Sequence, residues 1–186
     1  YNHYYLIRAR AISDPLRAID PRTGVNNRRE FERRLQDEID KLGYADTESL
    51  AVAMLDLGDF RGVTVEYGRQ TANEVLSEAA KSIEDSSRVD DCVARLGGDE
   101  FAIVLPGVDA DGARMLAQRF VRAVTLRFRV GDLPAASKIM PSAGFSLYGM
   151  HGRTIEELIT AADVALTAAK TSSRDGERVS SFVVSL

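Results

Sequence analysis

The stretch RLGGDEFAIVLPG at residues 95–107 decides the fold of this chain. Two apolar runs, at 93–96 and 101–105, flank two glycines and two acidic residues, Asp99 and Glu100. Glycine accepts a positive φ at no steric cost, and the tight turn between two antiparallel strands requires such a residue. The stretch therefore predicts a β-hairpin whose turn carries two adjacent carboxylates.

The apolar patterns on either side of this hairpin predict the remaining elements. The run LAVAMLDL at 50–57 is short and apolar, which is typical of a buried central strand. Apolar residues at helical spacing predict helices at 27–42, 71–86, 108–128 and 154–170. Further β-rich runs lie at 128–130, 138–147 and 179–184. This order predicts an α/β (α+β) fold: a central, mostly antiparallel five-stranded sheet with a split βαβ connection and helices packed around it.

Residues that start or end helices indicate how the chain is organised into a connector and a domain. Asn27 is available to cap the helix at 27–42, and Thr154 with Glu157 three residues later has the spacing of a capping box. Pro15 is expected to end or kink an amphipathic helix in the first residues of the chain. We therefore expect a connector helix at residues 1–19, the end of a signalling or coiled-coil linker, followed by one domain at residues 20–186.

Composition excludes several classes of protein. With 186 residues, 45% of them hydrophobic, the chain is long enough for one compact domain. A net charge of -4 argues against a surface that binds the nucleic-acid backbone, so a nucleotide partner is expected to be small. No apolar run approaches the ~20 residues that cross a bilayer, and the single cysteine, Cys92, fits a reducing compartment. We expect a cytoplasmic location and no membrane contact by this fragment.

The first residue, Tyr1, leads us to expect a fragment of a longer protein with a sensory domain upstream. A membrane anchor in that protein, and a further domain after Leu186, both stay open.

The acidic residues of the hairpin predict a metal site. Asp99 and Glu100 repel each other on a tight turn, and a divalent cation would remove that repulsion. Asp56 ends an apolar strand, and the ends of strands are where an α/β sheet places its ligand site. Oxygen ligands of this kind suit Mg²⁺ or Mn²⁺ together with phosphate oxygens. The alternative is a solvated acidic turn with no relation to Asp56.

Four blocks of the sequence resemble the GGDEF domain of diguanylate cyclases. The blocks are RLGGDEFAIVLPG at 95–107, DPRTGVNNRREF at 20–31, LDLGDF at 55–60 and ADVALTAAKTSSR at 162–174. They follow one another in the order and spacing of the family over about residues 20 to 184. The resemblance implies a sheet like that of class III nucleotidyl cyclases and polymerase palms, which binds one GTP per domain and forms cyclic di-GMP between two facing domains. A homodimer through the N-terminal helix is implied as well.

The resemblance also implies a role for individual residues. Asp56, Asp99 and the Leu57 carbonyl would hold the metal ions, with Glu100 near the second one, and Asp99 could help to deprotonate the attacking hydroxyl. The remaining substrate-binding positions are Gly97 and Gly98 beside the phosphates, Phe60, Arg61, Thr64 and Asn73 along the next helix, and Lys170 and Arg174 at the phosphate tail.

Several positions differ from the family pattern Asp-hydrophobic-Asp-x-Phe-Lys and from its guanine-reading residues. Gly58 stands for the second Asp and Arg61 for the Lys, and the Asn-Asp pair is Thr64 and Val65. Asn73 stands for the Asp that accepts hydrogen bonds from guanine. A carboxylate accepts from both guanine donors, whereas an amide offers only one carbonyl oxygen. We therefore expect weakened or altered base recognition, in which Asn73 could tolerate adenine.

A second nucleotide site is indicated by the segment Arg88-Val89-Asp90-Asp91. This Arg-x-x-Asp lies at the family's distance before the hairpin glycines, and Arg119 occupies the position of a further arginine. The resemblance makes these residues an inhibitory site for cyclic di-GMP, in which the arginines bind the guanine acceptors. As a bare motif, without the resemblance, the tetrad is interpreted as a solvated turn.

The sequence supports competing functions. One is a diguanylate cyclase that condenses two GTP to cyclic di-GMP in a dimer, with product feedback at the Arg-x-x-Asp site. The alternative is a degenerate, weakly active or inactive domain that acts as a regulatory module and binds cyclic di-GMP or another nucleotide. A purely structural dimerisation platform is ranked last, because it leaves the retained Asp56, Asp99 and Glu100 unexplained.

Overall fold

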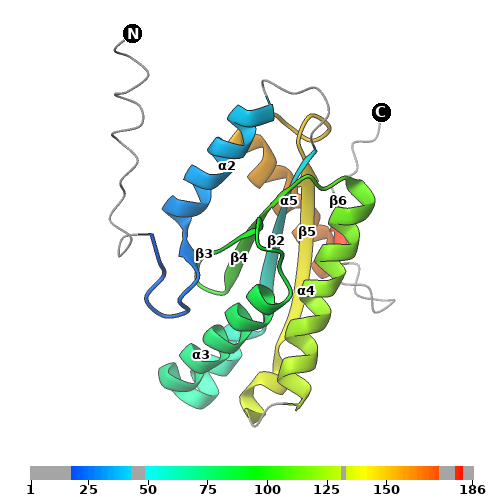
Figure 1. Ribbon diagram of the computed structural model, residues 1–186. Coiled ribbons are helices and arrows are strands. Elements are labelled where there is room, and N and C mark those ends of the chain that lie inside the picture. The colour runs from blue at the N-terminus through cyan, green and yellow to red at the C-terminus, as the bar shows by residue number, and fades with distance from the viewer. Residues whose placement is uncertain (1–17, 43–48, 131–132, 172–178, 182–186) are drawn as a thin grey trace.

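The computed structural model describes residues 18–42, 49–130, 133–171 and 179–181. Most of the expected connector at residues 1–19 and the phosphate-site candidate Arg174 lie outside these ranges. Within them, a single mixed sheet is covered by helices on both faces (Figure 1). The described residues contain no helix that is both long and apolar enough to cross a bilayer.

The sheet has the strand order β1-β3-β4-β2-β5-β6. Its antiparallel centre consists of β3 (Cys92–Gly97), β4 (Glu100–Pro106), β2 (Leu50–Gly58) and β5 (Met140–Leu147). The short strands β1 (Asn26–Asn27) and β6 (Val179–Ser181) add parallel edges beside β3 and β5. The predicted fold class is therefore confirmed, and the two-residue β1 is an edge that apolar patterning does not reveal.

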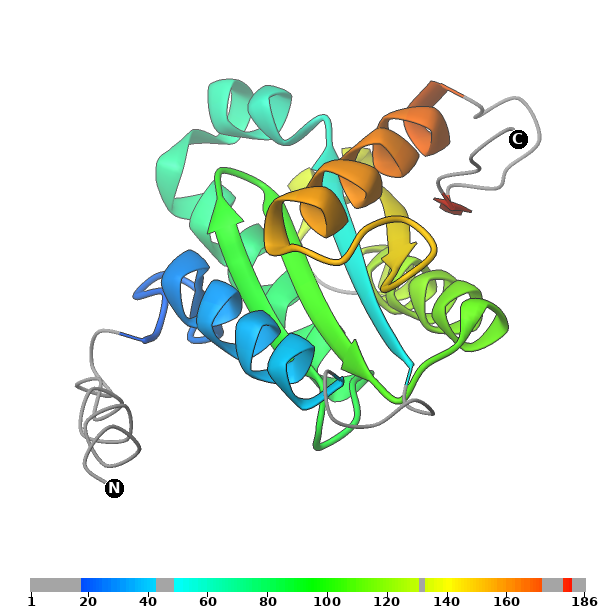
Figure 2. The ribbon, with the colours of Figure 1, turned by 90° about the horizontal axis from the view of Figure 1, so that it is seen from above.

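Two hydrophobic cores lie on opposite faces of the sheet. Helices α3 (Phe60–Asp85) and α4 (Ala110–Val130) cover one face, where they pack against alternate residues of β2, β4 and β5. Helices α2 (Arg28–Leu42) and α5 (Ile155–Thr171) cover the other face (Figure 2). Strand β2 is buried along nearly its whole length, as its continuous apolar run predicts, because both of its faces are covered.

The two predicted helix caps are confirmed by hydrogen bonds. The side chain of Asn27 accepts a hydrogen bond from the Glu30 amide at 3.0 Å. Thr154 and Glu157 form the reciprocal capping box, with the Glu157 amide 3.2 Å from the Thr154 hydroxyl and the Thr154 amide 3.1 Å from the Glu157 carboxylate.

Two predicted boundaries were wrong. The run at 128–130, expected to be a strand, belongs to α4, because Phe120, Val124 and Phe128 recur every four residues and bury one helical face in the core. Helix α3 begins at Phe60 rather than near residue 71, and it bends at Gly68, where φ is 84°. A glycine with positive φ interrupts the helical pattern without ending it.

Candidate active site

The expected catalytic residues meet where β2 ends beside the hairpin turn. In the register of the sheet, Asp56 of β2 lies opposite Glu100 of β4. The Leu57 amide donates a hydrogen bond to the Asp99 carbonyl at 3.2 Å, so the turn contacts the last residues of β2. The pairing of β2 with β4 thus brings together Asp56, Leu57, Asp99 and Glu100, as the sequence predicted.

The two glycines of the turn are required by conformation rather than by packing. Gly97 has φ 148° and Gly98 has φ 52°, both in the region that side chains rarely adopt. A Cβ added at either position would meet no heavy atom within 4 Å. The surface around these two residues is therefore open, and a bound group can approach the backbone of the turn.

The charges at this end of the sheet are unevenly neutralised. Asp56 is 7% exposed and forms an ion pair with Lys170 of α5, whose Nζ lies 2.9 Å from Asp56 Oδ2. Burial, followed by the nearby Asp56 charge, raises the pKa of Asp99 above its ordinary value. The pKa of Glu100 is raised by burial and by the charges of Asp56, Asp163 and Asp99. In the described part of the chain, Asp56 is the one of these three carboxylates that forms an ion pair, and the Lys170 charge only partly offsets the raised pKa values of the other two.

This donor set fits a divalent cation that shares its ligands with a phosphate. In the described residues, no group of three or more His, Cys, Asp and Glu side chains is arranged to hold a metal ion unaided. Mg²⁺ characteristically takes one or two carboxylates and completes its shell with water and substrate phosphates. The Asp56 and Asp99 carboxylates, with the Leu57 carbonyl, are the groups that would hold it, and Lys170 would have to leave Asp56 to make room.

The positions expected to read the base lie along the first part of α3. Phe60 packs against the core, whereas the Arg61 side chain is exposed. The Thr64 hydroxyl donates a hydrogen bond to the Phe60 carbonyl at 3.2 Å, which leaves its lone pairs as acceptors. Val65 is 81% exposed, and Asn73 is exposed in the helix beyond the bend at Gly68. Three of the departures from the family pattern, Arg61, Val65 and Asn73, thus lie on an accessible surface.

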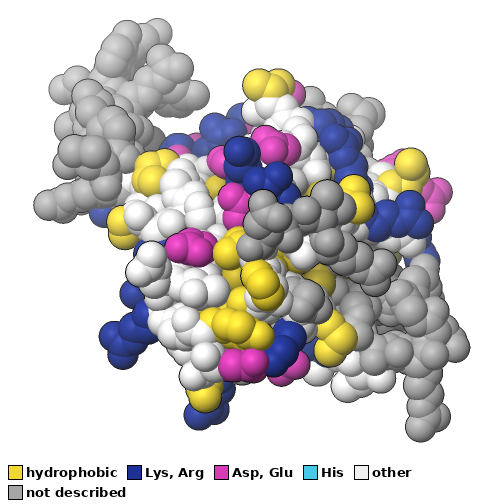
Figure 3. All heavy atoms as spheres, turned by 90° about the horizontal axis from the view of Figure 1, so that it is seen from below, with side chains coloured by type: hydrophobic (Ala, Val, Ile, Leu, Met, Phe, Trp, Pro, Cys, Tyr) yellow, Lys and Arg dark blue, Asp and Glu magenta, His cyan; other side chains and the backbone are white. Residues whose placement is uncertain are grey.

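This end of the molecule carries no dominant charge. Figure 3 views it from the side of α3, and Lys and Arg side chains alternate there with Asp and Glu around exposed hydrophobic side chains. Val65 and Met140 are among the exposed hydrophobic residues of the chain. A mixed surface of this kind suits a small ligand better than a polyanion.

The residues of the expected inhibitory site are only partly brought together. Arg88 and Arg119 line one cavity of about 470 Å³ between the start of α4 and the loop before β3, together with Val108, Met115 and Leu116. The Asp91 side chain, however, has no exposed surface. Its Oδ2 accepts a hydrogen bond from the Arg88 amide at 2.8 Å, and its Oδ1 lies 3.4 Å from Arg88 Nη2 without a hydrogen bond. Asp91 therefore holds the Arg88 turn instead of facing the cavity.

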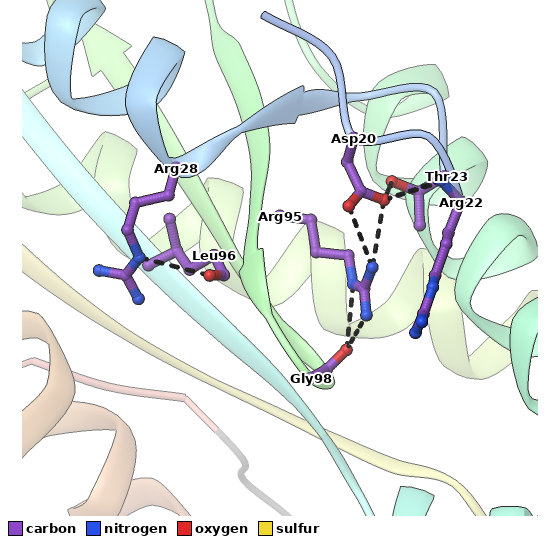
Figure 4. Close-up of polar contacts among 7 residues, drawn as sticks. All are labelled: Asp20, Arg22, Thr23, Arg28, Arg95, Leu96 and Gly98. Atoms are coloured by element: carbon purple, nitrogen blue, oxygen red, sulfur yellow. Dashed lines mark hydrogen bonds and ion pairs between the residues drawn. The ribbon is translucent and has the colours of Figure 1, made fainter. Parts of the chain in front are cut away.

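Sequence reasoning missed three residues that contact or influence the turn. Arg95 and Asp20 form an ion pair beside it, with Arg95 Nη1 3.1 Å from Asp20 Oδ2 (Figure 4). The charge of Asp163 on α5 reaches Glu100. Each of the three lies within a block that carries the family resemblance, but a block motif does not tell which of its residues touch one another.

The family profile described as "Diguanylate cyclase, GGDEF domain" matches residues 17–176. The chain is 32% identical over 157 residues to the bifunctional diguanylate cyclase/cyclic di-GMP phosphodiesterase MucR of Pseudomonas aeruginosa, covering 84% of this chain and 22% of MucR. It is 30% identical over 176 residues to the diguanylate cyclase DgcP of the same organism, covering 94% of this chain and 25% of DgcP. The chain thus spans about a quarter or less of the length of these relatives.

Solved structures agree with the sequence comparison. The GGDEF domain of DgcB from Caulobacter crescentus, in complex with c-di-GMP, has a TM-score of 0.77 at 25% identity and covers 88% of this chain and 94% of that one. A sensory box/GGDEF family protein from Caulobacter crescentus has a TM-score of 0.73 at 34% identity, with 84% of this chain and 99% of that one covered.

Proposed function

This chain belongs to the GGDEF domain family, and we propose that it is a diguanylate cyclase domain that condenses two GTP into cyclic di-GMP. In each half-reaction the 3′-oxygen of one GTP forms a bond to the α-phosphorus of the other, the bond from that phosphorus to the bridging oxygen breaks, and pyrophosphate leaves. The observation that carries the proposal is the meeting of Asp56, Asp99, Glu100 and Lys170 at one end of the sheet.

The residues of the chain have distinct tasks in this reaction. The raised pKa of Asp99 brings the carboxylate closer to the working pH of a general base, so Asp99 can accept the proton of the 3′-hydroxyl. Bound Mg²⁺ or Mn²⁺ would supply charge stabilisation for the pentacovalent phosphorus and the leaving pyrophosphate. Lys170 and Arg61 provide cations for the phosphate tail, and Arg174 is a further candidate. Gly97 and Gly98 leave room for the phosphates beside the turn.

The reaction requires two domains, because each one presents a single GTP. We infer a homodimer, assembled through residues 1–19, in a cytoplasmic protein whose other domains supply the input. Sedimentation of the chain with and without residues 1–19 would test the dimer. A dimer of unchanged stability without those residues would contradict the inference about the connector.

Product feedback is proposed at the cavity lined by Arg88 and Arg119. Guanine presents O6 and N7 as acceptors, which match an arginine fork, and the apolar wall at Met115 and Leu116 suits the flat bases. Binding to Asp91 would require its side chain to turn out of the interior, where Oδ1 lacks a hydrogen bond. Arg88→Ala is expected to abolish inhibition by added cyclic di-GMP while the initial rate stays unchanged.

The deciding experiment measures the two products of the reaction, pyrophosphate and cyclic di-GMP. Incubation of the chain with GTP and Mg²⁺ is expected to release pyrophosphate and cyclic di-GMP, and Asp99→Asn is expected to release neither. Absence of both products with the wild-type chain would contradict the proposal.

A second candidate function is favoured by the base-reading surface. The Thr64 hydroxyl is already bonded to Phe60, and Asn73 offers one acceptor where guanine has two adjacent donors. A site that leaves buried donors unmatched loses about 1–3 kcal/mol for each. In this alternative the domain binds cyclic di-GMP or a nucleotide and regulates a partner domain without turnover. Absent turnover, combined with cyclic di-GMP binding that Arg88→Ala abolishes, would select it.

A further inference from the structure

We propose that Asp20, acting through Arg95, is a positioning residue for the acidic turn of the hairpin. The proposal rests on the proposed function, because the turn matters for the reaction only if Asp99 and Glu100 take part in it. Figure 4 shows the arrangement: the loop that carries Asp20 lies beside the hairpin, and the Arg95 side chain extends from β3 to the space between the loop and the turn.

Arg95 bridges two groups that belong to different parts of the chain. Its Nε and Nη2 donate to the Gly98 carbonyl at 3.0 and 2.7 Å, and its Nη1 lies 3.2 and 3.1 Å from the two carboxylate oxygens of Asp20. The Arg95 side chain is only 6% exposed. A buried guanidinium is costly without a counter-charge, so Asp20 stabilises Arg95 in the position from which it reaches Gly98.

Asp20 is itself fixed before it meets Arg95. Its Oδ1 accepts hydrogen bonds from the Thr23 amide and hydroxyl at 3.0 and 2.8 Å, and it also accepts one from the Arg22 amide at 3.3 Å, which closes an Asx turn. Backbone bonds from the Asp20 amide to Val25 and from the Gly24 amide to Asp20 complete the loop. Burial acts to raise the pKa of Asp20, but the Thr23 hydrogen bonds and the Arg95 charge outweigh it and lower that pKa. Asp20 is therefore an ionised and preoriented acceptor.

The bond to Gly98 controls the position of Asp99. The Gly98 carbonyl, the Asp99 amide and the Asp99 Cα lie in one planar peptide unit, so a donor that fixes the carbonyl oxygen fixes the plane from which the Asp99 side chain departs. Gly97 and Gly98 provide little restraint of their own, because glycine has wide conformational freedom. On the other side of the turn, the Leu57 amide holds the Asp99 carbonyl at 3.2 Å.

A third hydrogen-bond donor, besides Arg95 and the Leu57 amide, holds the hairpin near its turn. Arg28, at the start of α2, donates from Nε to the Leu96 carbonyl at 3.3 Å. Arg28 is about half exposed and its guanidinium contacts Glu32 only at 3.9 Å, whereas Arg95 is buried between two charged or polar acceptors. The stronger restraint on the turn therefore comes from Arg95, and Asp20 is the residue on which that restraint depends.

Asp20→Asn separates positioning from local folding. The amide oxygen can still accept the Thr23 hydrogen bonds, so the loop keeps its shape, but the negative charge facing Arg95 is lost. The reporter is amide hydrogen exchange of Leu57, whose N–H points to the Asp99 carbonyl, measured without nucleotide or metal. Charge-assisted hydrogen bonds are strong enough that we expect about tenfold faster exchange at Leu57. The Tyr148 amide, which donates to Leu50 at the other end of β2, is expected to keep its rate.

A double variant tests whether Asp20 acts through Arg95. Arg95→Met is expected to accelerate Leu57 exchange at least as much as Asp20→Asn, and adding Asp20→Asn to it is expected to change nothing further. Asp37→Asn is the matched control, because it removes a carboxylate from the exposed ion pair with Arg33 on α2 and should leave both reporter amides unchanged. Turnover with GTP is expected to fall about tenfold in Asp20→Asn and to stay at the wild-type value in Asp37→Asn.

Unchanged Leu57 exchange in Asp20→Asn would overturn the proposal, and so would an equal additional effect in the Arg95→Met background. Accelerated Leu57 exchange with wild-type turnover would also overturn it, because the turn would then have loosened without consequence for the reaction. A wild-type chain without cyclase activity would contradict the proposed function instead. In that case, cation binding to the turn takes the place of turnover, and equal Mn²⁺ affinity in Asp20→Asn and the wild type would overturn the positioning role.

Discussion

Gly144→Ala tests whether the position of α5 depends on close contact with β5. Gly144 lies in β5 directly below α5, and a Cβ at this position would lie 2.1 Å from the Leu166 amide nitrogen and 2.4 Å from the Ala162 carbonyl oxygen. Both are backbone atoms of a helix, so no side-chain rotation can relieve the overlap. To restore an ordinary contact of 3.4 Å, α5 would have to move outward by about 1.3 Å.

The cost follows from what α5 buries. Its inner face carries Leu158, Ala161, Ala162, Ala165, Leu166 and Ala169. Overpacking of a dense core costs about 1–3 kcal/mol, and we expect the upper end, about 3 kcal/mol, because the added Cβ overlaps with helix backbone that no side-chain rotation can move. The same displacement would stretch the contact between Lys170 and Asp56, which is 2.9 Å in the intact chain. The variant is therefore expected to lose stability and also the alignment of its active site.

Urea unfolding measures the first effect and GTP turnover at a temperature where the variant is folded measures the second. Gly62→Ala is the matched control, because Gly62 lies in α3 and an added Cβ would have only the Asp59 carboxylate oxygen nearby, at 3.8 Å. That substitution is expected to be neutral or to stabilise the chain by about 0.5–1 kcal/mol through helix propensity. An unfolding midpoint of Gly144→Ala equal to that of the wild type would refute the reasoning.

Three further outcomes are expected from the site and the caps. Lys170→Met should lower the melting temperature, because it leaves the buried Asp56 without its cation, and Asp56→Asn in the same chain should restore it. Without nucleotide, Lys170→Met should also tighten Mn²⁺ binding, as measured by electron paramagnetic resonance. Asp99→Asn should raise the urea midpoint of the metal-free chain at neutral pH, because a raised pKa means that the ionised form disfavours folding. The gain should begin to shrink as the pH falls through that raised pKa, and it should vanish once the pH is below the ordinary aspartate pKa. Thr154→Ala should cost about 1 kcal/mol in urea unfolding through loss of the α5 cap, with no change in Mn²⁺ affinity.

Most of the fold could be predicted because local signals and tertiary structure agree. The hairpin glycines, the cap at Asn27 and the capping box at Thr154 each specify a boundary through atoms a few residues apart. The end of α4 was mistaken because alternating large and polar residues near 128–130 satisfy a strand pattern too. Phe128 and Val124 are both buried, which places them on the same helical face, and burial depends on how the whole chain packs rather than on the local sequence.

The candidate site was predicted in composition but not in its internal contacts. The family resemblance selects Asp56, Asp99 and Lys170, yet it does not say that Lys170 binds Asp56 before any ligand arrives. Likewise, Asp91 belongs to the expected inhibitory motif, but its side chain is buried and accepts a hydrogen bond from the Arg88 amide. The pairing of Asp20 with Arg95 joins residues 75 positions apart, a separation at which periodicity and capping rules carry no information.

These contacts give the nucleotide-free domain a particular electrostatic arrangement. Asp56 is neutralised by Lys170, and the Gly98 carbonyl is held by Arg95, so two elements of the site are occupied by the chain's own cations. The carboxylates of Asp99 and Glu100 keep raised pKa values because burial and the neighbouring acidic charges outweigh the opposing charge of Lys170. If a cation and a triphosphate bind at this site as proposed, Lys170 would exchange a carboxylate for a phosphate. Because the cation would release Lys170 from Asp56 and the triphosphate would offer it a new partner, cation and nucleotide should strengthen each other's binding, and Lys170→Met should reduce that coupling.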